Sequence, residues 1–352
     1  MYLRKRLAFK VFKQYKKNTV ELHELNSLFW ECTLRCNLQC LHCGSDCSKD
    51  TSAPDMPLAD FLKALDSIAK HIPPKKLFLI FSGGEPLMRK DLEECGKAVS
   101  KRGYEWGMVT NGLMLSPERL ASLRLAGLKS ISISLDGLEI AHNTLRNHPK
   151  SFMQALKAIQ LISESANLTF DVITCVSELN LHELHQIKEL LISLNVKQWR
   201  INTIFPVGRA TENKKLQLSP VDFTKLMDFI AATRKENRIH LNYSCEGFLG
   251  EFEGKVRDSF YFCRAGINIG SILIDGSISA CPNLRSNFIQ GNIYTDDFMA
   301  VWNTKFKKHR NRTWSQKGIC ATCEAFTHCE GNGMHLYNEK EELQVCHLHK
   351  IV

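Results

Sequence analysis

The chain has 352 residues, of which 44% are hydrophobic and 24% are charged. This length can bury a sizeable core in two structural units, and no run of about 18 apolar residues is present that could cross a membrane. The net charge is +9, and seven of these positive charges lie within residues 1–20, so the rest of the chain is nearly neutral. A broad basic surface for nucleic acid is therefore excluded, and we expect no nucleic-acid partner.

The N-terminal segment, residues 1–25, is basic and amphipathic. Its apolar residues recur every four positions beside Phe12, at Leu3, Leu7, Val11 and Tyr15. The cations around them are Arg4, Lys5, Arg6, Lys10, Lys13, Lys16 and Lys17. This spacing predicts a helix with one apolar stripe. Three interpretations stay open: a solvated helix that packs on the barrel, contact with an anionic membrane surface, or contact with an acidic peptide.

Residues 26–238 alternate strand-like apolar runs with helical patterns. Strands are predicted at residues 27–33, 76–82, 104–110, 130–135, 168–176 and 198–204. Helices are predicted at residues 57–71, 91–101, 117–125, 151–163, 181–194 and 220–237. Strands separated by helices of this length indicate an α/β fold with a parallel sheet and right-handed crossovers. Composition alone does not separate a barrel from a doubly wound sheet.

Three cysteines with C-x3-C-x2-C spacing follow the first predicted strand: Cys36, Cys40 and Cys43. Three thiolates can hold three corners of a cubane [4Fe-4S] cluster and leave the fourth iron open. For the triplet alone, a zinc fragment or unrelated core thiols are the alternatives. A fourth thiolate would occupy the open iron, so the other thiols of this region are interpreted as bystanders or core residues: Cys32, Cys47, Cys95 and Cys175.

Short segments end the next three predicted strands. They are Ser82-Gly83-Gly84-Glu85-Pro86, Thr110-Asn111-Gly112 and Ser134-Leu135-Asp136-Gly137, and Arg146 follows nine residues after Gly137. Together with the cysteine triplet, these segments resemble the radical SAM superfamily. The resemblance implies a partial (β/α)6 TIM-like barrel, open on one side, and a [4Fe-4S] cluster that binds S-adenosylmethionine (SAM). After the sixth strand, Pro206-Val207-Gly208-Arg209 also resembles a loop of related enzymes.

The same resemblance implies roles for individual residues in binding SAM. His42 is expected to lie against the adenine, and Ser134 is expected near the ribose. Arg146 is expected to bind the methionyl carboxylate, for which a guanidinium is well shaped. The backbone of Ser82, Gly83, Gly84, Glu85 and Pro86 is expected to bind the methionyl amino group, because glycine permits close approach of the main chain. Two further cofactor-binding positions are Asn111 and Asp136.

The C-terminal region, residues 239–352, is rich in cysteine. Residues 267–280 predict two short strands around Asp275-Gly276, a dipeptide that suits a tight hairpin turn. The region resembles the SPASM extension of radical SAM enzymes, at Cys263, Gly276, Cys281, Cys320, Cys323, Cys329 and Cys346. This resemblance implies a small cysteine-rich domain that holds one or two auxiliary iron–sulfur clusters.

One position departs from the SPASM pattern, because residue 333 is glycine where a cysteine is expected. The ligand set of the outer cluster is complete: Cys320, Cys323, Cys329 and Cys346. The inner cluster retains Cys263 and Cys281, with Cys245 as a third candidate, and is therefore open, differently ligated or absent. Zinc remains an alternative for the outer four cysteines. The nearby histidines are interpreted as surface or packing residues: His328, His335, His347 and His349.

These resemblances imply a radical SAM enzyme that cleaves SAM reductively to a 5′-deoxyadenosyl radical, which abstracts hydrogen from a substrate. A peptide or protein substrate is expected first, because SPASM relatives mostly modify peptides, and an electron donor such as flavodoxin or ferredoxin is implied. Tetrapyrrole side-chain chemistry of the haem pathway is the alternative reaction. A non-catalytic iron–sulfur or zinc scaffold is the alternative of another class. No catalytic acid or base is assigned.

The cysteine content also bears on the compartment. Fourteen cysteines at metal-ligand spacings, without a secretory signal, favour the reducing cytoplasm.

Overall fold

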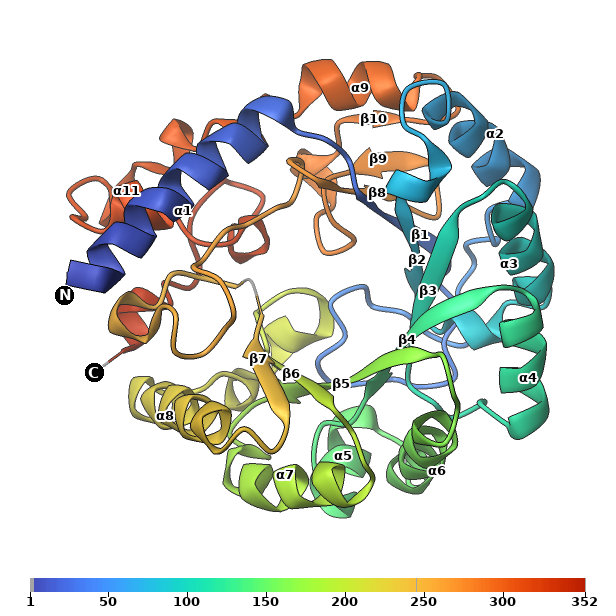
Figure 1. Ribbon diagram of the computed structural model, residues 1–352, viewed down its shortest axis with the longest axis horizontal. Coiled ribbons are helices and arrows are strands. Elements are labelled where there is room, and N and C mark those ends of the chain that lie inside the picture. Colours follow the sequence, from blue (N-terminus) through green and yellow to red (C-terminus); the bar gives the residue numbers. More distant parts are fainter. Residues whose placement is uncertain (1–2, 245, 352) are drawn as a thin grey trace.

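The computed structural model describes residues 3–244 and 246–351, and one curved sheet runs through this part of the chain (Figure 1). Its ten strands have the order β10-β9-β8-β1-β2-β3-β4-β5-β6-β7. All neighbouring strands in the run β8-β1-β2-β3-β4-β5-β6-β7 are parallel. Strand β9 pairs antiparallel with both β8 and β10. The α/β class with a parallel, partial barrel is thereby confirmed.

The strands of the barrel alternate with helices that cover its outer face (Figure 1). The strands are β1 Ser27–Thr33, β2 Phe78–Gly83, β3 Glu105–Thr110, β4 Leu128–Ser134, β5 Thr169–Val176, β6 Gln198–Thr203 and β7 His240–Tyr243. The helices are α2 Leu58–Ile68, α3 Leu92–Lys101, α4 Pro117–Leu125, α5 Glu139–Arg146, α6 Ser151–Ser163, α7 Leu184–Ser193 and α8 Pro220–Glu236. The sequence patterns did not predict the four-residue β7 or the eight-residue α5, which are too short to show a clear period.

Aromatic packing joins the sheet to its helices. The ring of Trp30 on β1 stacks on Phe61 of α2, with centroids 4.0 Å apart, and Phe81 stacks on Trp106 at 4.7 Å. These side chains alternate along the strands with residues that face the barrel interior. At the start of α4, Ser116 accepts a hydrogen bond from the backbone N–H of Arg119 and caps the helix.

The C-terminal region continues the same sheet. Strands β8 Ile269–Ile272 and β9 Ser277–Ser279 form the predicted hairpin, and β8 pairs parallel with β1. Buried Glu31 of β1 accepts the backbone N–H of Ile274 and pairs with Arg285, which fastens the hairpin to the barrel. The remaining strand is β10 Gly291–Asn292, and the remaining α-helices are α9 Phe298–Lys305, α10 Lys307–Arg310 and α11 Phe326–Cys329. The domain division at residue 238 stays a prediction, although β7 and β8 extend the sheet beyond it.

Helix α1, Leu3–Leu22, packs on the C-terminal region. The face that packs is not the predicted apolar stripe. The ring of Phe9 lies 4.4 Å from Phe260, and Phe12 lies 5.4 Å from the same ring. The described residues of the predicted stripe face solvent, with exposed fractions of 64%, 66% and 54% at Leu7, Val11 and Tyr15. Over residues 3–244 and 246–351, no helix is both long and apolar enough to cross a membrane.

A cavity of about 320 Å³ lies inside the barrel, away from the predicted site. Its wall includes the first residues of four strands, Phe78, Thr169, Gln198 and His240. It therefore opens at the amino ends of the strands, whereas the segments that resemble SAM-binding motifs follow their carboxyl ends.

Candidate active site

The cysteine triplet lies in a loop that leaves the carboxyl end of β1. The loop closes on itself, because the backbone N–H of Cys36 donates to the carbonyl of Ser48 at 3.0 Å. Cys36, Cys40 and Cys43 pack in one group with Cys47. Cys36 and Cys40 are buried and Cys43 is half-buried. The fold therefore gathers the three predicted cluster ligands at one point.

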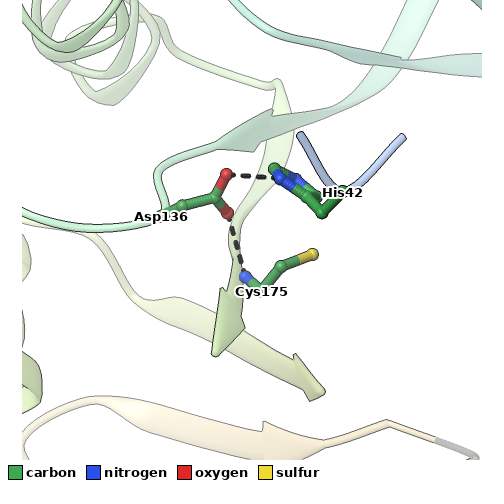
Figure 2. A group of neighbouring side chains, drawn as sticks. All are labelled: His42, Asp136 and Cys175. Atoms are coloured by element: carbon green, nitrogen blue, oxygen red, sulfur yellow. Dashed lines mark hydrogen bonds and ion pairs between the residues drawn. The ribbon is translucent and has the colours of Figure 1, made fainter. Parts of the chain in front are cut away.

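The spacing of the thiols favours a cluster over a single zinc ion. A tetrahedral zinc with bonds of about 2.3 Å holds its sulfur ligands about 3.8 Å apart. In the described part of the chain, only His42, Asp136 and Cys175 place three ligand atoms within 4.8 Å of one another (Figure 2). Neither the N-terminal triplet nor the outer C-terminal four is gathered so closely, as expected for thiolates that bind different irons.

Arg209 anchors the cysteine loop from the far side of the barrel. Its Nε donates to the carbonyl of Cys40 at 2.9 Å, and its backbone N–H donates to the carbonyl of Cys43 at 3.1 Å. Its guanidinium pairs with Asp46 at 2.6 Å. A Cβ at Gly208 would lie 2.5 Å from the Cys43 carbonyl oxygen. The sequence showed this loop, but the motif alone did not reveal that it positions the cysteines.

The two glycines at the end of β2 allow close packing against the strand that leads into the cysteine loop. Gly84 N–H donates to the carbonyl of Thr33 at 2.8 Å, and Glu85 N–H donates to that of Arg35 at 2.9 Å. A Cβ at Gly83 would lie 2.0 Å from the Thr33 oxygen, and one at Gly84 would lie 2.3 Å from the Arg35 oxygen. The glycines are therefore required by the protein's own backbone, independently of any ligand.

The carboxylate of Glu85 joins two of the motifs. It is buried and accepts hydrogen bonds from the hydroxyl of Thr110 at 2.7 Å and from the backbone N–H groups of Asn111 and Leu87 at 2.8 and 3.1 Å. Asn111 in turn donates to the side chain of Asn37 in the cysteine loop at 2.8 Å. This chain of contacts fixes the ends of β2 and β3 relative to the cysteines.

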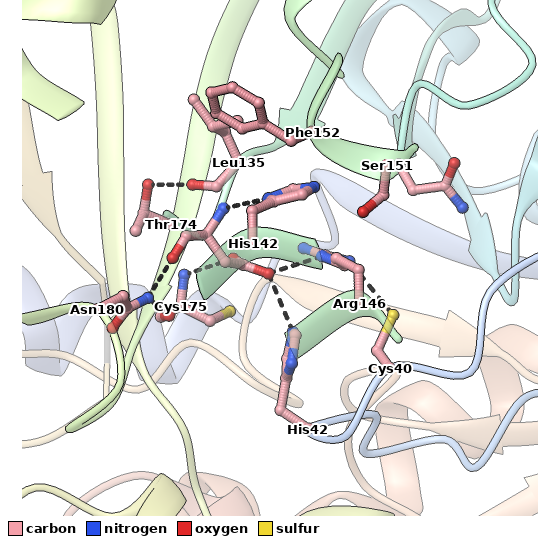
Figure 3. A network of polar contacts seen from close by, with 12 residues as sticks. Cys40, His42, Leu135, His142, Arg146, Ser151, Phe152, Thr174, Cys175 and Asn180 are labelled. Atoms are coloured by element: carbon pink, nitrogen blue, oxygen red, sulfur yellow. Dashed lines mark hydrogen bonds and ion pairs between the residues drawn. The ribbon is translucent and has the colours of Figure 1, made fainter. Parts of the chain in front are cut away.

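Asp136, just beyond β4, is the centre of a buried polar network, and Figure 3 shows its partners His42, Arg146 and Cys175. Its side chain is 0% exposed and lies 2.6 Å from Nε of Arg146 and 3.4 Å from Nε2 of His42. The backbone N–H of Cys175 donates to its other oxygen at 2.9 Å. Arg146, the last residue of α5, also donates through Nη1 to Sγ of Cys40 at 3.7 Å.

The charges of this network follow from burial and pairing. Burial raises the pKa of Asp136, but Arg146 and His42 outweigh it and hold that pKa below the usual value. Burial lowers the pKa of His42 to about 4, so this imidazole is neutral near pH 7. Asp136 and Arg146 therefore form a charged pair that holds the guanidinium against Cys40, a predicted cluster ligand.

The structure brings most of the predicted SAM-binding residues to one end of the barrel. His42 and Arg146 both contact Asp136, and Ser134 ends the neighbouring β4. Their roles toward SAM stay predictions. Cys175, which was interpreted as a core residue, joins this group, and strand alternation on β5 is the signal that places it on the inner face.

Two of the outer four cysteines of the C-terminal region share a common partner. The backbone N–H of Asn332 donates to Sγ of Cys329 at 3.2 Å, and its side chain donates to Sγ of Cys346 at 3.6 Å. Cys263 packs against the apolar cluster that contains Cys329. The other two of the outer four, Cys320 and Cys323, are joined by a turn, and Cys281, an inner candidate, follows β9. Cys245 lies outside the described residues.

Family models and known proteins match this arrangement. Residues 30–191 match the radical SAM superfamily, and residues 263–324 match SPASM, an iron-sulfur cluster-binding domain. An AdoMet-dependent heme synthase of Methanosarcina barkeri is 28% identical, over 86% of this chain and 89% of its own. A PqqA peptide cyclase of Bradyrhizobium diazoefficiens is 28% identical, over 84% of this chain and 77% of its own.

The crystal structure of Streptococcus suis SuiB bound to S-adenosylmethionine has the same fold, with a TM-score of 0.70 at 17% identity. The alignment covers 91% of this chain and 76% of SuiB. The cysteine loop, the polar strand ends and both family matches lead to one conclusion. The chain belongs to the radical SAM superfamily, as a SPASM-type enzyme with a [4Fe-4S] cluster that binds SAM and one or two auxiliary iron–sulfur clusters.

Proposed function

We propose that this enzyme modifies a peptide or protein by hydrogen abstraction. When bound, the reduced cluster supplies the electron that cleaves SAM to the 5′-deoxyadenosyl radical. The chain's own residues position the cysteine loop through Arg209 and hold the buried Asp136–Arg146 pair against Cys40. The observation that carries the substrate class is a groove between α1 and the C-terminal region.

This groove has a volume of about 810 Å³ and walls of mixed character. Helix α1 contributes Phe9 and Phe12 with the cations Lys10 and Lys13, and the opposite wall contributes Arg310, Arg312 and Phe326. Cations interleaved with aromatic rings suit an acidic peptide that carries apolar side chains.

The groove is separate from a second cavity beside the cysteine loop. That cavity, of about 390 Å³, is lined by Gly208, which approaches Cys43, and by Arg285 and Tyr337. Helices α1 and α11 lie across the molecule from α3 and α4 (Figure 1). The groove's lining includes no residue of the cysteine loop. An extended peptide can occupy both places at once, with one segment held and another presented, whereas a rigid tetrapyrrole fills one.

The relatives support this proposal and one alternative. The name of the PqqA peptide cyclase includes a peptide substrate, and this relative matches most of the chain. The heme synthase favours tetrapyrrole side-chain modification as the second candidate, because it also matches most of this chain.

The test compares both substrate classes on anaerobically reconstituted, reduced enzyme with SAM. We expect a mass change in short peptides encoded beside the gene and none in iron coproporphyrin III. Reversing two groove charges with Lys10→Glu/Lys13→Glu should weaken binding of a fluorescent peptide of Glu and Leu about tenfold at low salt. SAM cleavage without substrate should be unchanged.

Matched charge reversals at exposed lysines outside the groove, Lys129→Glu/Lys197→Glu, should leave peptide binding unchanged. Conversion of the tetrapyrrole with no peptide modified would replace the proposal with its alternative. If Lys10→Glu/Lys13→Glu binds the peptide as tightly as the wild type does, the groove is not the peptide-binding site.

The proposal includes an electron donor and a compartment. Each SAM cleavage consumes one electron, which a small protein such as flavodoxin or ferredoxin would deliver. The thirteen described cysteines are free of disulfides, and a reducing cytoplasm would keep them so.

The exposed stripe of α1 supports a peripheral contact with an anionic membrane. Leu7, Val11, Tyr15 and Leu22 are exposed on the helix, and cationic Lys10 and Lys17 lie among them in the sequence. We expect the enzyme to co-sediment with vesicles of phosphatidylserine and phosphatidylcholine, and Leu7→Glu/Val11→Glu to remove most of this binding. Equal sedimentation with pure phosphatidylcholine would contradict an electrostatic contribution.

A further inference from the structure

Residue 333 stands where the SPASM pattern has a cysteine, and the space for that side chain is already filled. A Cβ at Gly333 would lie 2.6 Å from Cε1 and 3.0 Å from Nδ1 of His335. It would also lie 2.7 Å from the carbonyl oxygen of Glu246. The imidazole of His335 therefore lies where a cysteine side chain would begin, and both cannot be present without rearrangement.

The ring of His335 is held in place but leaves one nitrogen without a partner. It packs on Phe205 with centroids 4.4 Å apart. Among the described residues, its Nε2 has no hydrogen-bond partner and is shielded from solvent. A buried nitrogen without a donor or acceptor is costly unless it binds something.

The surroundings of His335 connect it to the inner cluster's other candidate ligands. Gly333 N–H donates to the carbonyl of Glu246 at 2.9 Å, and Glu246 directly follows Cys245 in the sequence. His335 also lines the cavity of about 390 Å³ with residues 283–288, a segment that begins two residues after Cys281. The segment after Cys281 thus lines the same cavity as His335, and Glu246 contacts Gly333, two residues before this histidine.

We propose that Nε2 of His335 ligates the inner auxiliary cluster in place of the missing cysteine, so that a histidine joins the predicted ligands Cys263 and Cys281. The lone pair of Nε2 forms the bond to iron, and no electron is transferred. The proposal replaces the interpretation of His335 as a packing residue. It rests on the SPASM assignment and is independent of whether the substrate is a peptide or a tetrapyrrole.

The chemistry of the residue is consistent with this role. Burial lowers the pKa of His335 to about 4, so the imidazole is neutral and its lone pair is free near pH 7. Histidine also replaces cysteine on one iron of some iron–sulfur centres, where it raises the reduction potential.

The test uses the full chain with Cys36→Ala/Cys40→Ala/Cys43→Ala, which removes the SAM-binding cluster and its nitrogen ligand. The protein is labelled with 15N-histidine, reconstituted with iron and sulfide without SAM, and reduced. We expect about eight irons per chain, for two auxiliary clusters, and a strongly coupled histidine nitrogen in pulsed electron paramagnetic resonance. His335→Ala should abolish the coupling, whereas His328→Ala, a histidine packed on Phe9 under α1, should retain it.

A second variant, in which a cysteine replaces the histidine ligand, keeps the test decisive if His335→Ala loses the inner cluster. Gly333→Cys/His335→Ala should restore about eight irons without nitrogen coupling, because removing the ring makes room for the thiolate. The proposal is overturned if the parent shows no coupled histidine nitrogen, or if the coupling survives in His335→Ala. An iron content of about four in the parent, unchanged by His335→Ala, would overturn it as well, because no inner cluster would then exist.

Discussion

Replacing Cys36, Cys40 and Cys43 together by alanine is expected to abolish formation of 5′-deoxyadenosine from SAM under dithionite. The three thiolates are the predicted protein ligands of the SAM-binding cluster, and they pack in one group at this loop. All three are replaced because the thiol of Cys47 hydrogen-bonds that of Cys43, a contact that lowers the pKa of Cys43. A single substitution would leave this neighbour able to take over.

The measurement is chromatographic detection of 5′-deoxyadenosine after anaerobic reconstitution, with iron analysis on the same sample. The auxiliary iron should remain, because the C-terminal cysteines are untouched. Cys95→Ala is the matched control, since Cys95 is buried between α3 and the sheet and away from the loop. Undiminished cleavage by the triple variant would refute the assignment of the cluster to this loop.

Arg146→Ala is expected to have two separable effects. The first is on stability, because the variant leaves the carboxylate of Asp136 buried without its charged partner, and such losses cost about 3 kcal/mol of unfolding free energy or more. The second is on the ligand, because we expect SAM affinity to fall about thirtyfold if the guanidinium binds the methionyl carboxylate.

The pH dependence of stability identifies the first effect. The lowered pKa of Asp136 stabilises the folded wild type above the unfolded value of about 4, and this contribution is lost as pH falls through the folded pKa. Without Arg146, burial raises that pKa instead, so the variant loses stability as pH rises. Urea unfolding should therefore show a larger difference between the two proteins at pH 7.5 than at pH 4.5.

A second variant separates structure from SAM binding. Asp136→Asn/Arg146→Ala removes both charges and should recover part of the lost stability while SAM affinity stays low. Calorimetric titration with SAM on reconstituted protein measures the affinity. Wild-type affinity in Arg146→Ala would show that Arg146 serves only to pair with Asp136 and to contact Cys40.

The sequence by itself determined the chemistry of this protein and most of its fold. Spacing alone brought three thiols within one loop, and period and length placed the first six parallel strands within about two residues of their ends. Because the carboxyl ends of parallel strands meet at one edge, the glycine-rich, asparagine and aspartate segments could be expected beside the cysteines before any contact was known. Local sequence patterns are enough to predict a site where residues that are close in the chain are also close in the fold.

Only the tertiary structure decided which side chains meet across long separations. Helix α1 has two apolar faces, and the one that packs was selected by Phe248 and Phe260, more than 200 residues away. Periodicity indicates that a residue is buried but not which residues it packs against. The contact of Arg209 with the cysteine loop, and the position of Arg146 between Asp136 and Cys40, were therefore not predictable. The same reason applies to His335, whose position beside Gly333 depends on a backbone turn and on the packing of Phe205.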